Sequence, residues 1–177
     1  MANEYKKTMN LPKTGFPMRA SLAQNEPKRL AQWDEDKLYE QLLKKNEGHE
    51  KFVLHDGPPY ANGPIHLGHA QNKISKDIVN RYWAMRGYQT PYVPGWDCHG
   101  QPIEHKVEET LGTEKFNQLP TVKIRELCRK MAVEQVDTQR QGFKRLGVLG
   151  EWDNPYLTYV HDYDATDVEI FKAIFDK

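Results

Sequence analysis

Two histidines three positions apart, His66 and His69, are the residues whose spacing most directly suggests chemistry. They follow a loop rich in proline, glycine and asparagine (residues 58–68) and stand at the expected start of a helix. Positions three apart share one helix face, and free N–H groups at a helix start attract anions. The pair would therefore suit a polyphosphate that gains negative charge as pyrophosphate leaves. Gly68 between them would let a flat nucleobase approach the backbone.

A second loop, residues 95–102 (GWDCHGQP), contains an acidic residue, Asp97. Taken alone, an aspartate in a loop more commonly caps the backbone of that loop.

Nitrogen and sulfur donors leave a metal site open as an alternative. The donors are His55, His66, His69, Cys98, His99 and His105. Zinc needs three or four such ligands in a defined geometry, but neither an HExxH nor a CxxC spacing occurs. We therefore expect no zinc site in these residues, and we expect Cys98 and Cys128 to be free thiols.

The chain between residues 51 and 93 predicts a strand–helix–strand unit. Residues 51–57 (KFVLHDG) predict a short strand, and residues 88–93 (YQTPYV) predict another, interrupted by Pro91. The helix between them should start at the two histidines and end near Arg86, with one face marked by Ala70, Ile74, Ile78 and Tyr82. Such a unit is parallel with a right-handed crossover, and ligands bind at the carboxyl ends of its strands. We expect His66, His69 and Asp97 to face one cleft there.

The flanking regions predict further helices. Residues 1–27 should be an irregular arm, because Pro12, Pro17 and Pro27 interrupt it. A helix should then run from Pro27 to about Lys45, with Asn25 as its N-cap and a turn at residues 46–50. The second loop should lead into helices at 103–110 and 121–146, an extended stretch at 154–160 and a helix at 162–177.

Composition indicates a globular chain with no membrane segment. Hydrophobic residues make up 38% of the 177 residues, and no apolar run approaches the roughly 20 residues of a membrane helix. The start lacks the apolar stretch of a signal peptide, so we expect a cytoplasmic location. The 25 basic and 25 acidic residues give zero formal net charge. Phosphate contacts require clustered Lys and Arg, which argues against a self-sufficient nucleic-acid binder.

Four ordered blocks resemble the class I aminoacyl-tRNA synthetases, specifically the isoleucyl branch. They are TGFPMR (14–19), HDGPPYANGPIHLGH (55–69), PGWDCHGQPIE (94–104) and VDTQRQGFKRLGV (136–148). The second block resembles the HIGH signature of that class, with Leu67 where isoleucine is usual, and Gln101 stands where leucine is usual in the third. Valyl and leucyl relatives carry different residues before the histidines, which favours the isoleucyl branch.

The resemblance implies an α/β fold: the first half of a Rossmann-like nucleotide-binding catalytic domain with parallel strands. Residues 1–46 would be an N-terminal arm and helix, and residues 47–177 the first half of the catalytic domain, which stops before an editing insertion. The implied reaction joins isoleucine to ATP, accompanied by Mg²⁺, to give isoleucyl-adenylate and pyrophosphate. Transfer to isoleucine tRNA would follow.

The resemblance also assigns roles to residues of the two loops. His66 and His69 would contact the ATP phosphates and stabilise the transition state, and Gly68 would lie under the adenosine. Asn62 would help to shape the nucleotide site. On the isoleucine side, the roles fall on Gly57 and Pro58, as one wall of the side-chain pocket, and on Asp97, which would accept the substrate ammonium group.

The lysine-containing KMSKS signature of the same family does not occur among these residues. We therefore expect the 177 residues alone to charge tRNA poorly, with most tRNA contacts lying elsewhere. Two alternatives from other classes stay open at this point. One is a non-catalytic relative that binds a partner, and the other is a metal-dependent hydrolase that uses the histidine cluster.

Overall fold

The structure is a computed structural model that describes residues 8–10, 14–15, 17 and 19–177. The predicted arm over residues 1–27 and the TGFPMR block therefore lie partly outside the described residues. The described elements, in order, are α1 (Leu22–Glu35), α2 (Leu38–Lys45), α3 (Leu67–Met85), β1 (Gly95–Trp96), α4 (Gln101–Leu111), α5 (Thr113–Asn117), α6 (Thr121–Arg145), β2 (Tyr156–Leu157) and α7 (His161–Phe175).

The single helix predicted from Pro27 to Lys45 is wrong, because two helices occupy this region. The α1 helix begins at Leu22, so Pro27 lies inside it, and Asn25 is a helical residue rather than the N-cap. The Asn25 side chain instead donates to the carbonyl of Ala20 at 2.7 Å. The break before α2 falls at Lys37, whose φ of 49° is left-handed and incompatible with a continuous helix.

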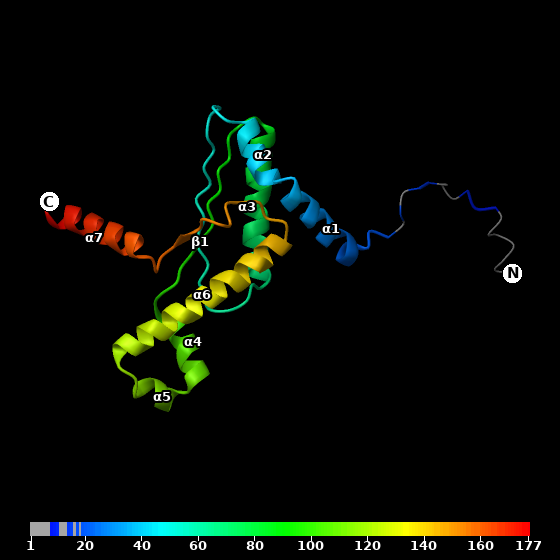
Figure 1. Ribbon diagram of the computed structural model, residues 1–177. Helices are drawn as coiled ribbons and strands as arrows, with labels where there is room; N and C mark the ends of the chain where they lie inside the picture. The colour runs from blue at the N-terminus through cyan, green and yellow to red at the C-terminus, as the bar shows by residue number, and fades with distance from the viewer. Residues whose placement is uncertain (1–7, 11–13, 16, 18) are drawn as a thin grey trace.

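Three extended segments run parallel in the centre of the molecule (Figure 1). The segment before α3 meets the segment after it at two isolated bridges, Lys51 with Gln89 and Tyr60 with Asp97. On the other side β1 pairs with β2, with Gly95 opposite Tyr156. The parallel direction and the α3 crossover are thus confirmed, whereas the strands predicted at 51–57 and 88–93, the second interrupted by Pro91, are wrong in extent.

The ladder between the first two extended segments is interrupted by prolines and by backbone groups that bond to other parts of the chain. Pro58, Pro59, Pro91 and Pro94 have no N–H to donate. Between the bridges, the backbone of Tyr92 is used by other elements. Its N–H donates to the Tyr39 hydroxyl of α2 at 2.9 Å, and its carbonyl accepts the N–H of Glu151 at 3.0 Å. The second extended segment is therefore held by hydrogen bonds to Tyr39 and Glu151 as well as by its bridges to the first segment.

The α3 helix crosses from the first extended segment to the second and buries a polar face. Its buried residues are Lys73, Asp77 and Asn80. The apolar positions that the sequence marks as one face are largely exposed, with Ile78 62% and Tyr82 48% accessible. The periodicity therefore predicts the helix correctly, but the apolar stripe is not the face that packs inward.

The apolar core lies between the second extended segment, α4 and α6. It is built on Trp96, Phe143 and Trp152, whose ring centroids lie 6.0–6.4 Å apart. The helices predicted at 103–110 and 121–146 correspond to α4 and α6, while the short α5 between them was not predicted. The predicted last helix is confirmed as α7, which projects from the body in Figure 1 and has every residue exposed.

Replacing Gly95 with alanine should disrupt the β1–β2 pairing. A Cβ at this position would overlap the ring of Tyr156, which lies opposite in the register. Overpacking of this kind typically costs about 1–3 kcal/mol, so Gly95→Ala should lower the urea midpoint of this chain. Gly15→Ala is the control, because a Cβ there meets nothing within 4 Å. Equal stability of the two variants would contradict the pairing.

Candidate functional site

His66 and His69 come together at the first turn of α3, as predicted. Their rings stack with centroids 3.9 Å apart and an angle of 22° between the planes. His66 is the N-cap of the helix, and its Nδ1 accepts the N–H groups of Gly68 at 3.1 Å and His69 at 3.4 Å. The Nδ1 of His69 in turn accepts the N–H of His66 at 3.3 Å, which completes a capping box made of two imidazoles.

This capping corrects one expectation about the helix start. The N–H groups of Gly68 and His69 are not free to receive an anion, because the His66 ring already accepts them. In the neutral form of each ring, the same bonds also set the tautomer. A nitrogen that accepts a hydrogen bond carries no proton, so each ring carries its proton on Nε2. Each histidine thus retains one N–H donor for another molecule.

Gly68 has a local structural reason to be glycine. A Cβ at this position would lie 3.0 Å from Cε1 and 3.1 Å from Nδ1 of His66, tighter than ordinary contacts. A side chain there would force the His66 ring to shift by a few tenths of an ångström. The absence of a side chain at Gly68 therefore leaves room for the stacked imidazole rings, independently of any ligand.

His69 is the more enclosed of the two imidazoles. Its ring meets Phe143 of α6 edge-on, with centroids 6.3 Å apart. Burial lowers the pKa of His69, and the neighbouring His66 and Lys73 lower it further. The neutral ring is therefore favoured near neutral pH, where it donates from Nε2 without carrying a positive charge.

The backbone brings the loop of Asn62 next to Asp97. The N–H of Ala61 donates to the Asp97 carbonyl, and the N–H of Asp97 donates to the Pro59 carbonyl, both at 2.9 Å. The Asp97 side chain is 35% exposed and lies 3.9 Å from Nδ1 of His99. These bonds join the two predicted loops, whereas a single cleft shared by His66, His69 and Asp97 stays a prediction.

A buried carboxylate that the sequence analysis did not identify lies directly before Gly57 and Pro58. Asp56 is 1% exposed and forms ion pairs with Lys73 and Lys76 of α3, the latter at 2.7 Å. The same carboxylate accepts the N–H of Gly95 at 3.1 Å. Its only signal in the sequence is an acidic residue at the end of an apolar strand, which is a weak one.

Burial alone would raise the pKa of the Asp56 carboxyl. The charge and hydrogen bond of Lys73, with further hydrogen bonds from Lys76 and the Gly95 N–H, outweigh burial and hold the pKa below its usual value. The carboxylate is therefore ionised at neutral pH. It fixes the beginning of the Gly57–Pro58 segment against α3 and β1.

Comparison with known proteins identifies the family. The model for tRNA synthetases class I (I, L, M and V) matches residues 28–177. This chain belongs to that family. The match covers most of the chain, including all three extended segments and every element from α3 to α7.

Among the curated relatives of this class I synthetase chain are bacterial isoleucine–tRNA ligases. The protein of Halorhodospira halophila is 57% identical over 172 residues, and that of Limosilactobacillus fermentum is 56% identical over 168. These alignments cover 97% and 95% of the chain but only 18% of each relative. The chain thus spans less than a fifth of the length of those two relatives.

A solved structure shows the same fold at low sequence identity. It is the crystal structure of the ternary complex of Agrobacterium radiobacter K84 agnB2 LeuRS-tRNA-LeuAMS. The match has a TM-score of 0.67 at 21% identity and covers 89% of this chain and 18% of that one. The likeness supports an α/β arrangement with parallel strands for this class I synthetase chain.

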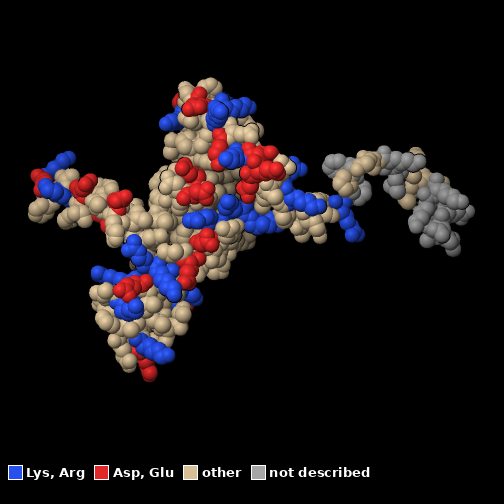
Figure 2. All heavy atoms as spheres, in the orientation of Figure 1, with Lys and Arg blue, Asp and Glu red and all other residues tan. Residues whose placement is uncertain are grey.

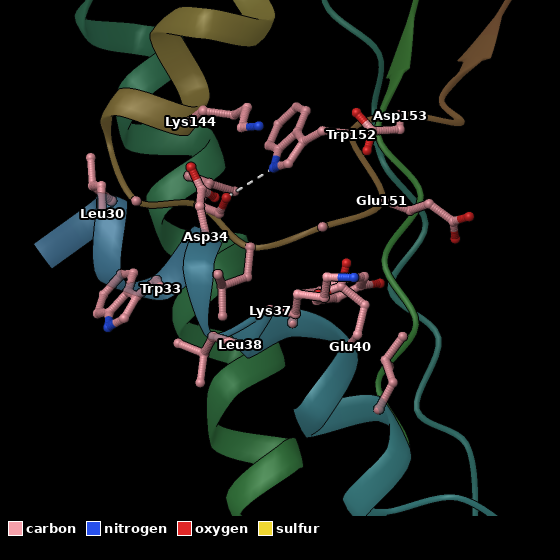
Figure 3. A pocket seen from close by; sticks show the side chains of 16 residues that line it. Leu30, Trp33, Asp34, Lys37, Leu38, Glu40, Lys144, Glu151, Trp152 and Asp153 are labelled. Atoms are coloured by element: carbon pink, nitrogen blue, oxygen red, sulfur yellow. Dashed lines mark hydrogen bonds between the residues drawn. The ribbon is translucent and has the colours of Figure 1, made fainter. Parts of the chain in front are cut away.

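A separate groove of about 640 Å³ lies between α1, α2 and the turn that follows α6 (Figure 3). Trp33 and Leu38 contribute to its wall, with Glu151 and Trp152 on the far side. The Trp152 indole N–H is already used, since it donates to the Val148 carbonyl at 3.0 Å. None of the predicted site residues lines this groove.

In the described part of the chain, no three His, Cys, Asp or Glu side chains cluster so that they could hold a metal ion. No helix among the same residues is long and apolar enough to cross a membrane. Cys98 and Cys128 are both free thiols, and burial raises the pKa of Cys98 to about 11. A thiol with a raised pKa is a poor nucleophile at neutral pH.

Replacing Lys73 with methionine should destabilise the chain strongly at neutral pH. Removing one partner of a buried ion pair typically costs about 3–5 kcal/mol, and Lys76 should keep the loss at the low end. Asp56 has a lowered folded pKa, so its stabilising contribution is present above about pH 4 and is lost as the pH falls through the folded pKa. The difference between Lys73→Met and wild type in urea unfolding should therefore shrink in acid.

The matched control for this experiment is Lys123→Met. Lys123 pairs with Glu126 at 2.8 Å, but both side chains are more than half exposed. Exposed pairs contribute little, so this variant should unfold like wild type at both pH values. Similar losses of unfolding free energy in the two variants would show that the buried Asp56 ion pair stabilises the chain no more than an exposed pair does.

Proposed function

We propose that this chain carries the histidine half of the active site of an isoleucine–tRNA ligase. Its reaction would join isoleucine to Mg²⁺-bound ATP, release pyrophosphate and pass the isoleucyl group to isoleucine tRNA. The observation that carries the proposal is the stacked His66–His69 pair at the start of α3, within a chain 52–57% identical to proteins of that name.

On the nucleotide side, His66 and His69 would donate from Nε2 to the phosphates. Their tautomers are fixed by the capping bonds, so the donors are set before a substrate arrives. Preorganised donors of this kind stabilise the charge that develops as pyrophosphate leaves. Gly68 would lie under the adenosine, and Asn62 would shape the nucleotide site.

On the isoleucine side, Asp97 would accept the substrate ammonium group. Its carboxylate is partly exposed, and its backbone is bonded to the loop of Asn62, which would hold the amino acid near the nucleotide. Gly57 and Pro58 would form one wall of the side-chain pocket. A Cβ on Gly57 would meet only Lys76 Nζ, at 3.7 Å, so the backbone there is open to a ligand.

The finer architecture is part of the same proposal. Residues 47–177 would be the first half of a Rossmann-like catalytic domain, and residues 1–46 an arm and helical region. The three parallel extended segments with α3 as their crossover support this assignment.

Recognition of tRNA would depend mostly on other parts of the protein. On the face shown in Figure 2, basic and acidic side chains are interspersed over the described elements. With a net charge of zero, such a surface attracts a polyanion weakly. The role proposed for these residues is therefore activation of the amino acid.

His69→Ala should slow adenylate formation in the full natural protein. The variant removes one preorganised donor, and such losses typically reduce kcat by about 10²–10³-fold. Isoleucine-dependent exchange of pyrophosphate into ATP measures this step. The control is His105→Ala on α4, where the side chain is 67% exposed and should not matter. A wild-type protein that shows no isoleucine-dependent exchange would favour a non-catalytic relative.

Asp97→Ala should weaken isoleucine binding and leave ATP binding nearly intact. The ammonium group would lose its charged partner, whereas the nucleotide donors lie on α3. Titration calorimetry of the full natural protein with each ligand separately measures both affinities. Asp137→Ala is the control, since Asp137 is an exposed carboxylate on α6. Unchanged isoleucine affinity in Asp97→Ala would remove Asp97 from the site.

A further inference from the structure

The α6 helix places one amide side chain between the two halves of the proposed site. Gln139 is 0% exposed and lies toward the C-terminal end of α6. Its Nε2 donates to the carbonyls of Tyr60 at 2.9 Å and Gly63 at 2.7 Å, on either side of Asn62. Its Oε1 accepts the indole N–H of Trp96 at 3.0 Å, one residue before Asp97.

The next turn of the same helix face also contacts the nucleotide loop. A Cβ on Gly142 would lie 2.8 Å from Cδ1 of Ile65, directly before the histidines. The absence of a side chain at Gly142 therefore allows α6 to approach the loop closely. Phe143, one residue further on, meets the rings of both His69 and Trp96.

Other contacts hold the two ends of the loop: the Ala61 N–H donates to the Asp97 carbonyl, and His66 caps α3. Residues 61–66 are irregular between the Tyr60 bridge and the start of α3. An irregular loop has no ladder to satisfy its carbonyl groups. Gln139 donates to the carbonyl of Gly63 within the loop and to that of Tyr60 directly before it. The buried amide of Gln139 donates both N–H groups to one side and accepts with its oxygen on the other. It therefore links the loop of Asn62 to the segment of Asp97.

We propose that Gln139 is a positioning residue for isoleucine activation, and that Gly142 assists it by admitting the loop against α6. Gln139 holds the loop of Asn62 and the segment of Asp97 in one fixed relation, so that nucleotide and amino acid meet in line. This role rests on the proposed function, because it matters only if both substrates bind there. Gln139 itself contacts neither reacting group.

Two substitutions of Gln139 separate its contacts. Gln139→Glu keeps an acceptor for the Trp96 indole but removes both donors to the loop. Gln139→Leu removes all three bonds. Misplacing reacting groups by about 1 Å can cost about 10²-fold in rate, so we expect Gln139→Glu to lower kcat by about 10–100-fold. Its KM for isoleucine should change little, whereas Gln139→Leu should raise that KM as well.

The measurement is isoleucine-dependent pyrophosphate exchange by the full natural protein, with both substrates varied. The matched control is Gln141→Glu, the same substitution two residues along α6 at an exposed position. A merely structural Gln139 would lower the amount of folded protein without this kcat and KM pattern. Gln139→Glu with wild-type kcat would overturn the proposal.

A second set of variants leaves Gln139 untouched, in case its variants do not fold. Gly142→Ala should lower kcat, because its Cβ would press on Ile65. Alanine favours helix over glycine, so a stability effect alone would not produce this loss. Ile65→Val removes the atom at 2.8 Å and should restore part of the rate in the double variant. Unchanged kcat in Gly142→Ala, or no recovery in the double variant, would overturn the role of this helix face.

Hydrogen exchange separates this proposal from the proposed function. The N–H groups of Ala61 and Asp97 are bonded between the two segments, and their protection can be measured without any substrate. Gln139→Glu should speed their exchange and Gln141→Glu should not. A wild-type protein without isoleucine-dependent activity would end the proposed function. Unchanged protection in Gln139→Glu would end the positioning role alone.

Discussion

The buried carboxylate of Asp56 is the constraint on which most of the structure depends. An ionised group taken out of water is costly unless charged partners and hydrogen bonds surround it. The charged partners are Lys73 and Lys76 of α3, and the Gly95 N–H of β1 adds a hydrogen bond, so three parts of the chain meet at the Asp56 carboxylate. Asp56 directly precedes Gly57, so it also fixes the position of the proposed wall of the isoleucine pocket.

Local signals were sufficient for the elements that depend on neighbours in sequence. The start of α3 at the two histidines, the long α6 and the terminal α7 were all predicted from the sequence. The sequence pattern failed to predict which face of α3 is buried, because that depends on residues far away in the chain. The apolar stripe of α3 is exposed because its polar face is needed elsewhere: Lys73 serves Asp56, and Asp77 accepts from the N–H of Leu149 at 2.9 Å.

The candidate site was predicted in part for the same reason. Spacing alone placed His66 and His69 on one turn, and the resemblance added Asp97. The stacking of the two rings could not be predicted, because it depends on a two-way capping box and on the missing side chain at Gly68. Gln139 gave even less signal, since a glutamine in a helix is ordinarily a surface residue. Its importance comes from contacts 76 and 79 residues away in the chain.

The electrostatics of the first turn of α3 follow from these contacts. Lys73 stands one turn below His69, so its charge, paired with Asp56, adds to burial in lowering the pKa of the imidazole. A neutral histidine attracts a phosphate through one directed N–H rather than through net charge. The capping bonds fix which nitrogen carries that proton, and the edge of Phe143 limits where the ring can turn. The chain therefore contributes direction more than charge at this position, in line with its zero net charge.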